Sequence, residues 1–569
     1  MDTRRLALLL VCALSLYMLW ENWQRYQHPQ APVATLPAAG TSVPRLPTPT
    51  SALSSGVPQP TVPLAPAHLP AVAPVAPAGE TLNITTPLYT AQISTQGGNL
   101  VDMELAHYTA FSDKRQKFHL FDAQHRYAAQ TGLGKTQGTL DLPTHKTLLT
   151  PLPGARAVAA GDAPLQVRLA APEADGVKAT KVYTFYPDSY RIDIAWELEN
   201  HGAQTLLPND YFAYFQLQRD GIAPEGDSFM LSSFYGAAVY TDAEKYQKAP
   251  YKEIGDGSAK YARNATDGWL AMVQHYFVAA WALPDTDRTP REFKLYTPEP
   301  GLYAAALILP FPKLAPGEKA TISAPLYAGP QDQAALKQVA TGLDLVVDYG
   351  WLHLIAAPLF WLLSAIHGLI GNWGWAIVIL TVLIKLALFP LSAASYKSMA
   401  KMRQLTPRLQ RLKELYGDDK MRMNQEMMKL YQTEKINPLG GCLPILMQVP
   451  VFIALYWVLL GAVEMRDAPW IFWISDLSAA DPYYVLPVIM MASMVLQTKL
   501  NPTPPDPIQA KVMMWMPFVF GVMFFFFPSG LVLYWVVNNV LSIAQQWQIT
   551  RMIESGGDKP QKAANDPKV

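Results

Sequence analysis

Residues 372–391 read NWGWAIVILTVLIKLALFPL, an apolar stretch of 20 residues that contains one charged side chain, Lys385. A helix of this length and hydropathy is long enough to cross a bilayer. An ammonium group inside such a span costs about 2.5–3.5 kcal/mol, and charged groups in spans usually face a water-filled cavity or a partner. Lys385 also lies about 9 Å from the end of the stretch, within snorkelling reach of the headgroups. We therefore predict a functional cation, with snorkelling as the alternative.

The composition of the chain is that of a membrane protein. Of the 569 residues, 50% are apolar and only 16% are charged. The formal net charge is zero, so the overall charge gives no support to a nucleic-acid partner. Cys12 and Cys442 lie far apart in apolar stretches, which excludes a disulfide framework or a Cys-based metal site as an inference.

The first 79 residues predict a membrane anchor followed by a linker. Arg4 and Arg5 precede an apolar run with bulky residues at its end and no small-residue cleavage site, so residues 1–28 are predicted to be an uncleaved transmembrane anchor. Residues 29–79 contain thirteen prolines and one formal charge, Arg45. Such a segment cannot bury enough apolar surface to fold, and we predict an extended linker.

Residues 80–333 have the pattern of an antiparallel β domain. Ile192, Ile194, Trp196 and Leu198 alternate with charged residues, which is the period of a half-buried strand. An upstream strand is predicted at residues 181–186, with a turn at residues 187–189. About 250 residues of this texture predict a large β-sandwich.

After residue 334 helices predominate. Residues 334–371 include an apolar stretch interrupted by Pro358 and two histidines, and Gly371 alone separates it from the next span, so we predict an amphipathic helix on the membrane surface. With the anchor, six spans are expected. The other five are residues 372–391, 442–463, 483–499, 512–527 and 531–547.

The charges of the loops predict the orientation. Residues 392–441 contain ten basic and five acidic residues, whereas residues 464–482 contain one basic residue and four acids. The first segment is therefore predicted to be cytoplasmic and the second external. By the same alternation residues 500–511 form a cytoplasmic loop, residues 548–569 a cytoplasmic tail, and the β domain lies outside with both termini inside.

The basic segment also has helical periodicity, with apolar residues three and four apart on either side of a turn at residues 417–419. We predict an antiparallel helical hairpin. Two hypotheses remain for it: a solvated charged surface, or a docking arm for a ribosome, a nascent chain or a membrane surface. The basic residues that would contact such a partner are Lys401, Arg403, Arg408, Arg411 and Lys413.

The motifs of common enzymes are absent from the sequence. We find no His-Glu-x-x-His helix, no Gly-x-Ser-x-Gly elbow and no cluster of metal ligands, so we expect no enzymatic activity, no metal and no cofactor. Two other functions remain open. A transporter of an anionic solute would use Lys385 but would need an internal repeat, which we do not find. A carbohydrate enzyme in the external domain would need an acid–base pair, which the sequence does not reveal.

The membrane region resembles the YidC/Oxa family of membrane protein insertases. The resemblance rests on short motifs that occur in order over about 200 residues: TVLIK at 381–385 with FPL at 389–391, SMAKM at 398–402, NPLGGCLP at 437–444, QVP at 448–450, DLS at 476–478 with DPY at 481–483, and FPSGLVLYW at 527–535. The linker and the large external domain after a first span resemble the Gram-negative form. That form implies an inner-membrane location and a periplasmic domain similar to a galactose-mutarotase-like β-supersandwich.

The resemblance implies a polar groove that opens to the cytoplasm and to lipid. In this family a buried arginine lies at its centre, and Lys385 occupies that position here, without the bidentate fork of an arginine. The groove would be lined by polar and aromatic side chains from several spans: Thr381, Gln448, Tyr534, Trp535, Asn538 and Gln545.

The resemblance further implies the activity and the partners. A polar, often acidic, external segment of a substrate would enter the groove without ATP hydrolysis and pass outward while its apolar span enters the lipid. The implied substrates are nascent inner-membrane proteins, which the protein would insert and help to fold, alone or with the Sec translocon. The ribosome or nascent chain and membrane lipid are further implied partners, and no direct contact with nucleic acid is implied.

Overall fold

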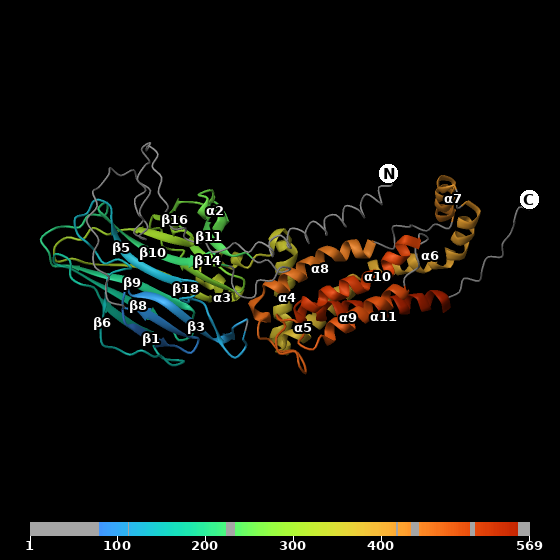
Figure 1. Cartoon of the computed structure of the whole chain (residues 1–569), viewed down its shortest axis with the longest axis horizontal. Helices are drawn as coiled ribbons and strands as arrows, with labels where there is room; N and C mark the ends of the chain where they lie inside the picture. Colours follow the sequence, from blue (N-terminus) through green and yellow to red (C-terminus); the bar gives the residue numbers. More distant parts are fainter. Residues whose placement is uncertain are drawn as a thin grey trace, which may run out of the picture. The chain divides into compact units, whose positions relative to one another are not determined.

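The computed structural model describes residues 79–111, 113–222, 234–416, 419–433, 443–500 and 507–555. The predicted anchor at residues 1–28, the linker up to residue 78 and the tail beyond residue 555 lie outside the described residues. Within the described part, an all-β domain is followed by a region of helices (Figure 1).

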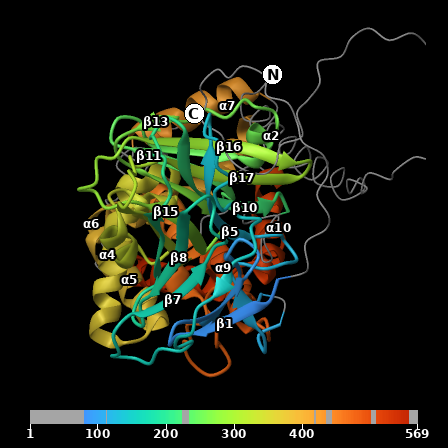
Figure 2. The same cartoon turned by 90° about the vertical axis from the view of Figure 1, so that its left-hand side faces the viewer.

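The β domain consists of two nine-stranded sheets in which all pairings between strands are antiparallel (Figures 1 and 2). The first sheet has the order β1-β2-β3-β5-β10-β17-β16-β13, with β4 paired to β3. Its strands are β1 Thr81–Thr85, β2 Tyr89–Ser94, β3 Asn99–Thr109, β4 Lys117–His119, β5 Ala128–Lys135, β10 Tyr211–Asp220, β13 Asn264–Ala265, β16 Arg291–Glu299 and β17 Leu302–Pro310.

The second sheet has the order β12-β11-β14-β15-β18-β9-β8-β7-β6. Its strands are β6 Thr150–Pro151, β7 Leu165–Ala170, β8 Val177–Phe185, β9 Arg191–Asn200, β11 Gly236–Thr241, β12 Lys245–Pro250, β14 Trp269–Val273, β15 Phe277–Ala282 and β18 Lys319–Pro330.

The core lies between the sheets because strands such as β9 bury one face. Every second residue of β9 is buried, including Ile192, Ile194 and Trp196, as the sequence predicted. The indole Nε1 of Trp196 donates to Oγ1 of Thr131 in the opposite sheet at 3.0 Å, which satisfies a polar atom that burial would otherwise penalise. The prediction of a large β-sandwich is confirmed.

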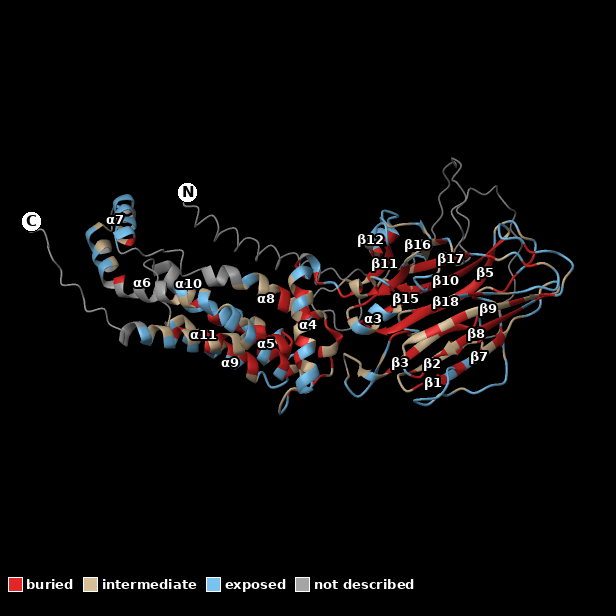
Figure 3. Ribbon diagram, turned by 180° about the vertical axis from the view of Figure 1, so that it is seen from behind, coloured by how far each residue is buried: buried red, intermediate tan, exposed pale blue. Residues whose placement is uncertain are grey.

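The helical region contains a short helix and a hairpin as well as the long apolar helices (Figures 1 and 3). Its helices are α3 Gln333–Val339, α4 His353–Ile370, α5 Trp373–Ala387, α6 Phe389–Tyr416, α7 Lys420–Thr433, α8 Leu443–Gly461, α9 Val485–Leu500, α10 Pro507–Met523 and α11 Ser529–Ser555. Short helical turns are α2 Tyr251–Gly255 in the β domain and the 3-10 turns η1 Leu343–Val346, η2 Gly350–Leu352, η4 Val463–Met465 and η5 Phe524–Phe526.

Helix α5, which carries Lys385, ends earlier than the sequence predicted. The span was expected to reach residue 391, whereas α5 ends at Ala387 and the chain bends by 64° into α6. Pro390 explains the break, because proline lacks a backbone N–H and is accepted in the first turn of a new helix. The hairpin arm therefore begins at Phe389 and not at residue 392.

Fewer of the described helices are long and apolar enough to cross a membrane than the sequence predicted. By length and hydropathy, one described helix, α4, could cross a membrane, or two if the bent pair of α5 with the start of α6 forms a single span. The apolar parts of α8, α9 and α10 are shorter, and α11 carries amides that lower its hydropathy. The count of six spans therefore stays a prediction.

Candidate functional site

Polar and aromatic residues recur along one face of α11. Trp535, Asn538, Ser542 and Gln545 are spaced by three and four residues, which places them in line on a helix. Helix α5 packs against α11 and brings Lys385 to this face. The site is thus built from two helices far apart in the sequence.

Lys385 lies buried at the centre of this site, with 5% of its surface exposed. Its Nζ donates to Oγ of Ser542 at 2.7 Å, and Ser542 in turn donates to the backbone oxygen of Asn538 at 2.7 Å. Among the described residues, no carboxylate lies within ion-pair distance of Lys385. A buried ammonium group that is solvated by a neutral hydroxyl leaves an attractive site for an anion.

A third helix joins the network through Gln448 of α8. Its amide nitrogen donates to the side-chain oxygen of Asn538 at 2.6 Å. The three residues Lys385, Gln448 and Asn538, which the sequence predicted, therefore belong to one network. Lys385 bonds to Ser542, Ser542 bonds to the backbone of Asn538, and the side chain of Asn538 bonds to Gln448.

The other four predicted groove residues take different roles. Thr381 is buried, and its hydroxyl donates to the backbone oxygen of Ile377 at 2.7 Å, within its own helix. Tyr534 is also buried, and its ring is stacked 6.2 Å from that of Phe452. Trp535 meets the same ring edge-on, with the centroids 4.5 Å apart. The buried side-chain oxygen of Gln545 has no hydrogen-bond partner among the described residues.

Ser542 was missed by the sequence analysis, although it makes the hydrogen bond to Lys385. The available signal was its position four residues after Asn538, on the same helical face. A serine in an apolar helix commonly bonds to the carbonyl four residues earlier and then has no further role. The sequence therefore does not distinguish Ser542 from such a serine, and Ser542 does make this bond.

Helix α11 has a second polar seam, against α9. The side-chain nitrogen of Asn539 donates to Oγ of Ser493 at 3.2 Å, and that of Gln546 donates to the backbone oxygen of Leu500 at 3.2 Å. Hydrogen bonds of this kind fix the packing of helices in lipid. This seam holds α11 in place while its other face carries the residues around Lys385.

The helical hairpin predicted from the sequence is formed by α6 and α7. Leu405 and Tyr431 are buried between the two helices, with Leu409, Met427 and Leu430 packed around them. Arg408 and Arg411 are exposed. The side chains of the other three predicted contact residues lie outside the described residues: Lys401, Arg403 and Lys413.

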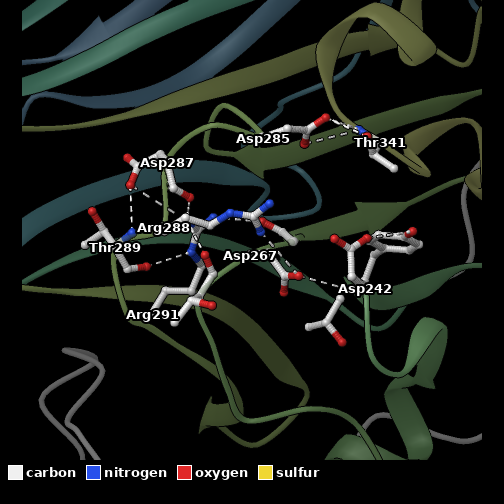
Figure 4. Close-up of polar contacts among 12 residues, drawn as sticks. Asp242, Asp267, Asp285, Asp287, Arg288, Thr289, Arg291 and Thr341 are labelled. Carbon is white, nitrogen blue, oxygen red and sulfur yellow. Dashed lines mark hydrogen bonds and ion pairs between the residues drawn. The ribbon is translucent and has the colours of Figure 1, made fainter.

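The β domain contains a cluster of aspartates and arginines linked by polar contacts (Figure 4). Arg291 at its centre is buried and donates to backbone oxygens of Thr289, Gly268 and Asp287. Asp285 accepts hydrogen bonds from the backbone and hydroxyl of Thr341. These contacts hold loops together, and among the described residues no group of His, Cys, Asp and Glu is placed to hold a metal ion.

The chain matches known proteins over nearly its whole length. Residues 365–556 match the family described as 60Kd inner membrane protein, and residues 81–362 match the family described as YidC periplasmic domain. The chain is 59% identical to the membrane protein insertase YidC of Dechloromonas aromatica, with 100% of both proteins covered. It is 57% identical to that of Aromatoleum aromaticum, over 98% of this chain and 100% of the relative.

Among solved structures, an active YidC insertase with its first transmembrane domain resolved aligns with 82% of this chain and 94% of its own length, at 18% identity and a TM-score of 0.38. The relatives with high identity are named insertases, and the family performs no enzymatic reaction. The chain therefore belongs to the YidC family of bacterial membrane protein insertases, as an inner-membrane protein with a periplasmic β-sandwich domain.

Proposed function

We propose that the residues around Lys385 form the groove through which this insertase passes the polar external segment of a substrate. The segment enters from the cytoplasm, is held by the buried cation, and moves outward as the apolar span of the substrate enters lipid. The groove consists of Lys385, Thr381, Gln448, Tyr534, Trp535, Asn538, Gln545 and Ser542.

The observation that carries this proposal is the hydrogen bond between Lys385 and Ser542. A buried cation bound to a neutral hydroxyl, with no carboxylate among its described neighbours, gains most when an anionic group arrives. An acidic residue in a substrate supplies that charge, and the groove then attracts acidic segments more than basic ones. Insertion needs no ATP in this scheme, because the final burial of the apolar span in lipid is favourable.

The proposed topology has six spans with both termini in the cytoplasm. Its spans are the anchor at residues 1–28 and residues 372–391, 442–463, 483–499, 512–527 and 531–547. The supporting observation is the contrast between the basic segment at residues 392–441 and the acidic loop at residues 464–482. A periplasmic β domain requires the same orientation.

Helix α4 is proposed to lie on the periplasmic surface of the membrane, although it is long enough to cross it. Figures 1 and 3 both draw α4 running across the direction of α8 and α11. One face of α4 packs against α5 and α8, while Leu354, Trp361 and Leu369 are exposed by 86%, 71% and 89%. An exposed apolar stripe on a helix of this orientation suits the boundary between headgroups and acyl chains.

Two short helices favour a locally thin bilayer beside the groove. Helix α9 has 16 residues and α10 has 17. At 1.5 Å per residue they span about 25 Å, compared with about 30 Å for a hydrocarbon core. A mismatch of this size thins the bilayer and shortens the path of the polar segment.

The hairpin of α6 and α7 is proposed to capture the substrate before insertion, through contacts with the ribosome or the nascent chain. Its basic excess and the exposure of Arg408 and Arg411 support this role. The protein is proposed to work alone or with the Sec translocon. A full-length protein in which residues 398–435 are replaced by a short linker should remain in the membrane and lose insertion, whereas normal insertion would reduce the hairpin to a solvated surface.

The central experiment compares three variants at Lys385 in proteoliposomes, with a small substrate whose external segment is acidic. Lys385→Arg should retain insertion, Lys385→Gln should reduce it, and Lys385→Glu should reduce it by about tenfold or more, because like charges repel more strongly at a buried position than in water. Lys511→Glu is the control, because this exposed lysine undergoes the same charge change outside the groove. Equal insertion by all three Lys385 variants would show that Lys385 only snorkels.

A further inference from the structure

Four aromatic side chains are exposed in the segment that joins η4 to α9. Phe472 is exposed by 89%, Trp473 by 36%, Tyr483 by 69% and Tyr484 by 48%. We call these residues the aromatic platform. Large apolar side chains grouped on a surface in this way indicate a contact with something outside the chain.

The aromatic platform is rigidly attached to the first turn of α9. The rings of Phe472 and Trp473 are stacked with their centroids 5.9 Å apart, and Trp473 meets Tyr483 edge-on at 6.3 Å. The indole of Trp473 donates to the buried carboxylate of Asp481 at 3.0 Å. That carboxylate also accepts from the backbone N–H of Leu486, near the start of α9, at 2.8 Å. The rings therefore keep a fixed height relative to α9.

The backbone of the platform is strained. Phe472 has φ = 51° and Tyr484 has φ = 58°, in the left-handed region that bulky residues avoid. Strain of this kind persists where the surroundings compensate for it. The ring of Phe472 stacks on Trp473, but 89% of the surface of Phe472 is exposed in the described part of the chain, which leaves room for a further contact on this ring.

The platform lies where the outer ends of several membrane helices meet. The side-chain nitrogen of Asn372, which caps α5, donates to the backbone oxygen of Trp470 at 3.3 Å. At the start of α11, the backbone N–H of Gly530 donates to the oxygen of Leu477 at 2.9 Å. On α9 itself, the exposed side chains of Val488 and Ile489 continue the apolar surface toward the middle of the span.

We propose that the aromatic platform sits among the headgroups of the outer leaflet and fixes the depth of α9 in the bilayer. This inference rests on the proposed topology, in which the loop is periplasmic. Tyrosine and tryptophan favour this interface because their rings are apolar and their polar atoms remain hydrated. A platform attached to a helix of 16 residues holds the bilayer surface close to the end of that helix, so it maintains the thin region beside the groove.

The depth of the platform can be measured with a fluorescent label. Phe472→Cys is labelled with NBD in the full chain after Cys12 and Cys442 are replaced by serine, and the protein is placed in phosphatidylcholine–phosphatidylglycerol liposomes without any other protein. The label should be quenched most by a headgroup spin label and less by one at carbon 12 of the acyl chain. Aqueous iodide should quench it little.

Two matched positions calibrate the depth measurement. Ile489→Cys should be quenched best by the deep acyl-chain label, because this residue is exposed on α9. Asp141→Cys, in the β domain, should be quenched by iodide alone, because the side chain of Asp141 is 90% exposed. If the label at residue 472 behaves like the one at residue 141, the platform does not touch lipid and the proposal fails. Because no other protein is present, quenching by lipid labels excludes a protein partner as its cause.

A separate measurement distinguishes a failure of the platform proposal from a failure of the proposed topology. An impermeant thiol reagent added to the periplasmic side should modify both Asp141→Cys and Phe472→Cys in detergent-free membranes opened on that side. Modification of both residues from the periplasmic side, combined with iodide-only quenching at residue 472, overturns the platform while the proposed topology stands. Modification of residue 472 from the cytoplasmic side overturns the topology as well.

The functional role is tested by two substitutions of Phe472. Phe472→Trp should keep insertion, because tryptophan prefers the same interface. Phe472→Asp should lower insertion by about threefold or more, with the largest loss in bilayers of long-chain lipid, where the mismatch with α9 is greatest. Equal insertion by both variants at every bilayer thickness would show that the platform does not set the depth of α9.

Discussion

The ammonium group of Lys385 lies 2.7 Å from the hydroxyl of Ser542, and this hydrogen bond joins α5 to α11, the last of the described helices. Both residues are buried. The serine can accept from Lys385 while it donates to the carbonyl of Asn538, so one hydroxyl orients the cation and is itself oriented by the backbone.

Replacing Ser542 by alanine should destabilise the folded protein. The buried ammonium would lose this acceptor, which should lower the free energy of unfolding by about 1–3 kcal/mol. Ser542→Thr keeps a hydroxyl and serves as the control. Thermal unfolding of the purified protein in detergent, followed by tryptophan fluorescence, measures the change. In a double-mutant cycle with Lys385→Met the two effects should not add, and strict additivity would show that the hydrogen bond is unimportant.

The contact between Gln448 and Asn538 should couple α8 to α11. Gln448→Leu and Asn538→Leu each leave one amide without its partner, whereas the double variant removes both. The coupling energy should be about 0.5–2 kcal/mol, as for other hydrogen bonds between helices in membranes. Thermal unfolding of the four proteins gives the value, and a coupling of zero would contradict the network.

Gly374 should tolerate no side chain. A Cβ atom at this position would lie 2.2 Å from Cδ1 of Trp470, so Gly374→Ala forces the loop away from α5. Such overpacking lowers the free energy of unfolding by about 1–3 kcal/mol. The matched control is Gly368→Ala in α4, where no atom lies within 4 Å and alanine favours the helix. Thermal midpoints should therefore move in opposite directions, and equal shifts would contradict the close contact.

Stability should depend on pH through Glu464. Burial raises the pKa of its carboxyl group to about 7 from 4.5, and the nearby charge of Asp332 adds to the shift. Between these values the folded protein holds a proton that the unfolded chain has lost. The free energy of unfolding therefore falls as pH rises through this window, by at most about 1.4 kcal/mol per pH unit.

The test for Glu464 compares thermal midpoints of the original protein and Glu464→Gln from pH 4.5 to pH 7.5. The amide cannot ionise, so the variant should lose this part of the pH dependence and be the more stable protein at neutral pH. Parallel curves for the two proteins would show that Glu464 is not a buried acid. Besides Asp332, the titratable groups near Glu464 include Tyr108 and Tyr349, whose pKa values burial raises, so that both stay neutral in this range.

Sequence periodicity predicted the β domain well because burial alone determines it. In β9 the alternation of Ile192, Ile194 and Trp196 with charged residues leaves one possible register for a strand with one buried face. The helical region was predicted less accurately at its ends. The break after Ala387 depends on Pro390, whose position two residues beyond the bend indicates a new helix only once the bend is known.

The candidate site was predicted in part. Lys385 was evident because a charge in an apolar stretch is rare, and Gln448 and Asn538 were marked by polarity in the same way. Their pairing could not be read from the sequence, because it depends on how three helices rotate and pack. Ser542 has no distinguishing charge or size, and the inward direction of its hydroxyl is a property of tertiary packing.

The bend at Leu388 has a mechanical consequence. This single residue separates the helix that carries Lys385 from the helix that becomes the first arm of the hairpin, and the two helices meet at 64°. With so short a joint, a tilt of the hairpin applies a torque to α5 and rotates or lifts the lysine relative to Ser542. A load on the hairpin would thereby act on the position of the cation.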